Sequence, residues 1–176
     1  QGDLIPPIIG PLVRAPFTNS DIQKQPESTG FIGGYKFKSP IEAFTSVEIG
    51  IQIQPDPRTG DSTAECKISR DPRFDYEDSS VNFFEDTLTK TNHIKRIPIA
   101  NTPILPGENN RIELEANKVN TFYVKCKDAN GNVNLKSYFI EIPVKQGPDT
   151  APPEIKSFSI KNNAFLPYNL KETPLT

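Results

Sequence analysis

Apolar and polar residues alternate over short stretches in the middle of this chain, which is typical of β-strands with one buried face. The clearest case is residues 47–54 (VEIGIQIQ), where Val47, Ile49, Ile51 and Ile53 share one face. The other predicted strands are residues 64–68, 92–99, 111–115, 121–127 and 138–144. No stretch has the spacing of a helix longer than one or two turns.

Two of these stretches predict a β-hairpin around a polar turn. Phe122, Val124 and Cys126 alternate with polar neighbours before the turn, and residues 138–144 repeat the pattern after it. The turn residues are Asp128, Asn130, Gly131 and Asn132. A tight reversal needs backbone angles with positive φ, which Asn and Gly tolerate. We therefore expect this hairpin to lie at the centre of the fold.

Proline and glycine set the lengths of these elements. The chain has 18 Pro and 10 Gly among 176 residues, spread so that short strands are favoured over helices. About seven strands at this spacing predict an all-β fold of two packed antiparallel sheets, an immunoglobulin-like β-sandwich. We expect residues 31–145 to form the sandwich, residues 1–30 an N-terminal edge strand or strap, and residues 146–176 a linker with a strand-like extension.

Composition excludes several classes of partner. The 20 basic and 22 acidic side chains are mixed along the sequence, so no basic stripe is present to bind nucleic acid. No apolar run approaches the roughly 20 residues that span a bilayer, so we expect no membrane insertion by this chain. The absence of Met and the Gln at position 1 lead us to expect a cut chain, through removal of a signal peptide or propeptide or excision from a longer protein, and we expect it to be secreted.

The two cysteines lie too far apart for a redox or zinc motif. Cys66 and Cys126 therefore form either a disulfide or a pair of buried thiols, and the expected secretion favours the disulfide. A bridge of this span stabilises a fold by roughly 4 kcal/mol in the chain-entropy model.

Several sequence features resemble a known class of repeat. Cys66, the segment YVKCKDANGNVN at residues 123–134 and the segment DTAPP at residues 149–153 together resemble immunoglobulin-like or fibronectin type III-like repeat modules of bacterial secreted and cell-surface proteins. In that group a strand-turn-strand of this kind closes each domain, and a DxxPP linker opens the next.

This resemblance covers residues 47–153. It implies a β-sandwich, extracellular or cell-surface placement, a Cys66–Cys126 bridge and no catalytic activity. The chain departs from antibody-type domains because it has no Trp, and because Tyr123 precedes Cys126 by three residues rather than two.

Candidate catalytic and ligand-binding groups have simpler structural explanations. The segment from Asp128 to Asn134 is similar to the start of a calcium loop, but it lacks a late bidentate Glu, so a turn is favoured. The acidic residues between 71 and 86 predict a solvated loop, with a weak calcium site as the alternative, and His93 is the only histidine. We therefore expect no enzyme, no metal site and no cofactor. Five aromatic residues are candidates either for a sugar platform or, as we favour, for core packing: Tyr35, Phe74, Tyr76, Phe83 and Phe84.

The terminal extensions suggest how the protein is used. Both contain apolar, strand-like stretches that we expect to lack a partner strand in their own subunit; the residues concerned are Ile8, Ile9, Leu12, Val13, Ile155, Phe158, Ile160, Phe165 and Leu166. Strand donation to a neighbouring copy would cover them and join copies head to tail into a filament or surface assembly. The alternative is an adhesive or carbohydrate-binding module that binds a surface glycan or protein as part of a larger secreted protein.

Overall fold

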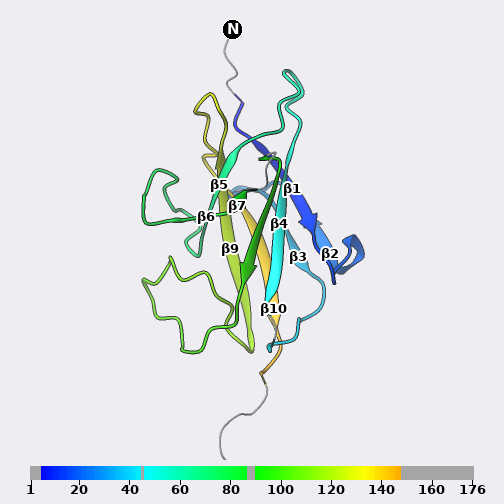
Figure 1. Cartoon of the computed structure of the whole chain (residues 1–176), viewed down its shortest axis with the longest axis vertical. Helices are drawn as coiled ribbons and strands as arrows, with labels where there is room; N and C mark the ends of the chain where they lie inside the picture. The colour runs from blue at the N-terminus through cyan, green and yellow to red at the C-terminus, as the bar shows by residue number, and fades with distance from the viewer. Residues whose placement is uncertain (1–4, 45, 87–89, 148–176) are drawn as a thin grey trace, which may run out of the picture.

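The alternating segments pair into two β-sheets in the computed structural model, which describes residues 5–44, 46–86 and 90–147 (Figure 1). The elements are β1 (Ile8–Val13), η1, a 3-10 turn (Asn19–Asp21), β2 (Ile22–Gln25), β3 (Phe31–Phe37), β4 (Val47–Gln54), β5 (Glu65–Ser69), β6 (Asn82–Phe83), β7 (Glu85–Asp86), β8 (Asn92–Ile97), β9 (Lys118–Lys127) and β10 (Ser137–Val144). The expectation of an all-β fold with almost no helix is confirmed.

The two sheets differ in size. One has the strand order β1-β4-β8-β7, and the other has the order β2-β3-β10-β9-β5-β6. The neighbouring strands are antiparallel except β3 and β10, which run parallel. The predicted β9–β10 hairpin is confirmed and lies in the middle of the larger sheet, between β3 and β5.

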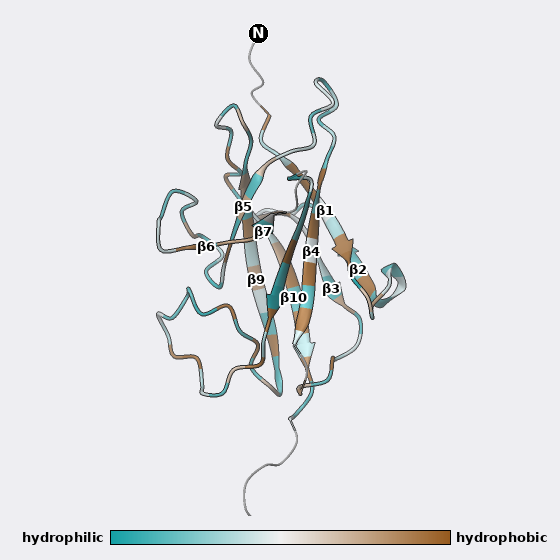
Figure 2. Ribbon diagram, in the orientation of Figure 1, coloured by the Kyte–Doolittle hydropathy of each residue, from teal (hydrophilic) through white to brown (hydrophobic). Residues whose placement is uncertain are grey.

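The sheets bury their apolar faces against each other to form one core. All four apolar residues predicted to face inward on β4 are at most 3% exposed. The inward residues Phe122, Val124 and Cys126 of β9 are fully buried, as the alternation predicted. Along the strands, apolar segments alternate with polar ones (Figure 2). This arrangement makes the protein sandwich-like.

The N-terminal region is part of these sheets. β1 pairs with β4 over residues 8–13, and β2 pairs with β3 over residues 22–25, so each is the edge strand of one sheet. The expectation that Ile8, Ile9, Leu12 and Val13 lack a partner strand in their own chain is therefore wrong. The prolines restrict this region to sheet edges, where missing amide donors are tolerated, but do not keep it outside the body.

A buried asparagine joins the start of the chain to the hairpin. The Asn134 side chain accepts a hydrogen bond from the Cys126 amide at 2.8 Å and donates one to the Pro7 carbonyl oxygen, also at 2.8 Å. It therefore satisfies two backbone groups from segments far apart in sequence. This contact helps to explain why β1 begins where it does.

The parallel pairing of β3 with β10 depends on a close backbone approach at Gly34. A Cβ at this position would lie 2.5 Å from the Phe139 carbonyl oxygen, which is backbone and cannot rotate away. Any larger residue would force the two strands apart. Gly30, in contrast, has no atom within 4 Å of the corresponding position.

We expect Gly34→Ala to destabilise the protein by about 2 kcal/mol or more, because overpacking at a rigid strand contact has few ways to relax. The matched substitution Gly30→Ala should change the free energy of unfolding by less than about 0.5 kcal/mol. Urea unfolding of both variants measures the difference. Equal stability of the two variants would contradict the close approach.

Candidate interaction surface

The two cysteines form a disulfide between adjacent strands of the same sheet. Cys66 on β5 lies directly opposite Cys126 on β9, and both residues are fully buried. The bridge therefore reinforces one strand pair and does not join the two sheets. Such a bond is stable in oxidising compartments.

The predicted turn residues lie together in a tight reversal. The Asp128 carboxylate accepts hydrogen bonds from the backbone amides of Asn130 and Asn132, both at 2.9 Å, and Gly131 has a φ of 89°. The Asn132 side-chain amide also donates to Asp128, at 3.0 Å. These contacts are those of an Asx turn. Among the described residues, no three His, Cys, Asp or Glu side chains gather closely enough to hold a metal ion.

A polar loop covers the outer face of the larger sheet and buries two lysines beneath it. The Lys67 ammonium donates to the Tyr76 carbonyl oxygen at 2.6 Å, and that of Lys125 donates to the Phe74 carbonyl oxygen at 2.7 Å. Burial lowers the pKa of Lys125, although the nearby carboxylates of Asp75 and Asp71 oppose the shift. The lysines therefore fix the course of the loop.

The aromatic candidates for a sugar platform are mostly buried. Tyr35, Phe74, Tyr76 and Phe84 are each at most 5% exposed, whereas Phe83 is 54% exposed. Tyr76 and Phe74 also contact lysine ammonium groups, Lys67 at 4.7 Å and Lys125 at 5.3 Å from the respective ring centres. Core and loop packing is thus the use of the four buried rings, as the sequence favoured.

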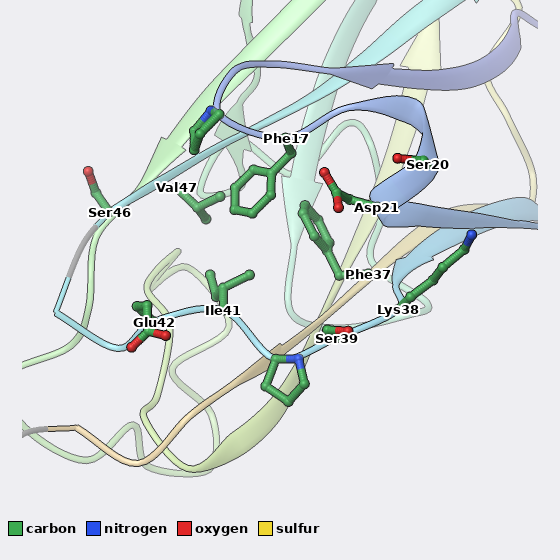
Figure 3. Close-up of a pocket in the computed structure, with 12 residues that line it drawn as sticks. Phe17, Ser20, Asp21, Phe37, Lys38, Ser39, Ile41, Glu42, Ser46 and Val47 are labelled. Atoms are coloured by element: carbon green, nitrogen blue, oxygen red, sulfur yellow. The ribbon is translucent and has the colours of Figure 1, made fainter.

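An apolar groove of about 630 Å³ lies at the end of the sandwich where β4 begins (Figure 3). Phe17, Phe37, Ile41 and Val47 point into it, and the Phe17 and Phe37 rings meet edge to face at 5.0 Å. Polar side chains, among them Asp21, Lys38 and Glu42, lie around it. The side chains that point into the groove are apolar and its rim is polar, a lining that suits binding of an apolar segment.

Sequence reasoning did not find this groove. Its walls come from the segment after β1 and from the stretch between the end of β3 and the start of β4, and these two parts meet only in the folded chain. Alternation predicts that Val47 faces inward, but it does not predict a groove at this end of the sandwich. Lys67 and Lys125 occupy outward strand positions, and only the path of the covering loop buries them.

The predicted strand-donation residues fall into two groups. Ile8, Ile9, Leu12 and Val13 lie on β1, along the edge of the smaller sheet. The others, Ile155, Phe158, Ile160, Phe165 and Leu166, lie outside the described residues.

No protein-family model, no curated protein and no solved structure matches this chain. Within the part of the chain that the structure describes, no helix is long and apolar enough to cross a membrane.

Two buried tyrosines, Tyr35 and Tyr138, differ in the hydrogen bonding of their hydroxyl groups. The Tyr35 hydroxyl donates to the Gly50 carbonyl oxygen at 2.8 Å and so links the two sheets. The Tyr138 hydroxyl is buried and has no hydrogen-bond partner among the described residues. Burial raises the pKa of both tyrosines well above the ordinary value, and the neighbouring Tyr35 raises the pKa of Tyr138 further. Neither phenol is accessible for chemistry.

We expect Tyr138→Phe to leave stability unchanged or to raise it by up to about 1 kcal/mol, because the substitution removes an unpaired buried hydroxyl. Tyr35→Phe should instead lower stability by about 1 kcal/mol, because the Gly50 carbonyl loses its partner. Chemical denaturation of the two variants compares them directly. A larger loss for Tyr138→Phe than for Tyr35→Phe would contradict the assignment.

The same tyrosines predict a loss of stability in alkaline solution. Their pKa values are raised in the folded state, so above pH of about 10 the unfolded chain releases protons that the folded chain retains. Each such tyrosine should reduce the free energy of unfolding by about 1.4 kcal/mol per pH unit there. As the pH rises above about 10, the urea midpoint should fall less steeply in Tyr138→Phe than in the parent chain.

Proposed function

We propose that this protein is a non-enzymatic structural subunit of an extracellular or cell-surface assembly. In this proposal it has an immunoglobulin-like fold, and copies join head to tail through the segment that follows β10. The observation that carries the proposal is the placement of the chain ends. The N-terminal segment enters at one end of the sandwich, and β10 leaves at the opposite end (Figure 1).

The strand order supports the immunoglobulin-like topology. The order β1-β4-β8-β7 corresponds to strands A, B, E and D of that fold, and the order β10-β9-β5 to strands G, F and C. β6 then occupies the position next to C that variable-type domains add. The disulfide differs from the antibody pattern, because it joins the C and F positions within one sheet rather than B and F across the sandwich.

The disulfide also supports a location outside the reducing cytosol. Bonds of this kind persist in secreted and surface proteins and are rare elsewhere. The resemblance to bacterial surface modules agrees with this placement. The buried Cys66–Cys126 pair is thus a modest, independent argument for the extracellular part of the proposal.

Because the chain enters and leaves the sandwich at opposite ends, a linear arrangement of copies is favoured. A segment that leaves one end of a copy points toward the starting end of the next, and a contact of this type repeats without closing. Because β1 is already paired with β4, the C-terminal segment at residues 154–175 is the better candidate for a donated strand. An edge strand, such as β1 or β2, would accept it.

Deletion of residues 152–176 tests the role of this segment. We expect the shortened chain to remain folded and disulfide-bonded, because the described strands all end before residue 147, and to remain monomeric. The full chain should form filaments visible by electron microscopy and should sediment as a polymer. Long polymers of the shortened chain, or a full chain that stays monomeric at every concentration, would contradict the proposal.

A carbohydrate-binding role has no supporting observation in this fold. The rings of Phe74 and Tyr76, which would have had to present flat faces to a sugar, are buried. We therefore propose no second function.

A further inference from the structure

The groove at the end of the sandwich lies beside the point where the chain leaves the fold. Ile41, in its wall, pairs with Val144 at the end of β10, and the Lys145 amide donates to the Ile41 carbonyl oxygen at 2.9 Å. The Lys145 ammonium forms an ion pair with Glu42 on the rim of the groove. Gly147 then lies near Ala43, with 3.6 Å between the Ala43 Cβ and the place of a Gly147 Cβ.

One large apolar side chain is exposed close in sequence to the groove wall. Phe44 follows the wall residues Ile41 and Glu42 in the chain, and it is 68% exposed. The volume of about 630 Å³ falls within the range of pockets that hold a ligand of several side chains.

We propose that this groove binds the C-terminal segment of the same chain, with the apolar residues Ile155, Phe158 and Ile160 as its anchors. The groove supplies apolar walls at Phe17, Phe37 and Val47, which complement these side chains. The inference does not depend on filament formation, because it concerns a contact within one molecule. In the proposed function, the groove would hold the C-terminal segment before that segment is donated to a neighbouring copy.

Reach favours the segment of the same chain over that of a second copy. Ile155 follows Gly147 by eight residues, which span up to about 27 Å when extended, and Gly147 already lies beside the wall. A short tether gives an effective concentration in the millimolar range. At a protein concentration of about 10 µM, the segment of another copy competes at roughly a hundredfold disadvantage.

Photo-crosslinking in the full chain tests this contact. The substitution Phe158→p-benzoyl-L-phenylalanine places a reactive group at the central anchor, and irradiation at about 10 µM keeps the tethered contact dominant. We expect cross-links within the monomer to the tryptic peptides at residues 15–24 and 39–58, which contain Phe17, Ile41 and Val47. The same group at Phe83, which lies on exposed β6, should not produce them.

Tail variants test whether apolar docking causes the cross-link. Ile155→Asp combined with Ile160→Asp should reduce the cross-link yield by about tenfold or more, because unpaired carboxylates do not enter an apolar groove. The matched pair Ser157→Asp and Ser159→Asp adds the same charge and should retain the cross-link. All of these changes lie outside the described strands, so they leave the sandwich intact.

Three results would overturn the inference. These are cross-links only between two copies, cross-links to other parts of the sandwich, and a yield that the Ile155→Asp and Ile160→Asp pair leaves unchanged. Failure of the proposed function is a separate result, since a chain that never forms filaments could still give the cross-link within the monomer. Conversely, filaments without this cross-link would agree with the proposed function and contradict binding of the C-terminal segment in the groove.

Discussion

The hairpin of β9 and β10 is the contact on which the rest of this fold depends. It lies at the centre of the larger sheet, and its inward residues are among the most completely buried in the described chain. β3 pairs with β10 and β5 pairs with β9, so both neighbouring strands depend on the hairpin for their backbone hydrogen bonds. The Asp128 turn sets its register, and a shift of one residue would turn its apolar face toward solvent.

Contacts that spread from this hairpin determine where the other segments lie. Asn134 holds the start of the chain through Pro7, and Gly34 allows the backbone of β3 to approach β10. On the outer face, Lys67 and Lys125 hold the long loop through its carbonyl oxygens. A few polar groups thus specify positions that the apolar core alone would leave undetermined.

Sequence reasoning recovered the features that depend on local pattern. Alternation predicted the observed limits of β4, the hairpin and the inward residues. It did so because a strand with one buried face has alternating apolar and polar residues. It failed where position depends on pairing between distant segments. Proline content indicates an edge position for residues 8–13, but it does not show that β4 of the same chain is the partner. The groove was missed for the same reason, since Phe17, Phe37 and Val47 meet only after the sheets have formed.

The parallel pairing of β3 and β10 has a mechanical consequence. The chain enters and leaves at opposite ends of the long axis, so tension on the ends acts along the strands (Figure 1). A pull on residue 147 draws β10 lengthwise past β3 and β9, which loads the backbone hydrogen bonds of both ladders in shear at the same time. Bonds loaded in this way must fail together, whereas bonds pulled apart from one end of a ladder fail one after another. A string of such subunits would therefore resist stretching at each subunit as well as at the joints between them.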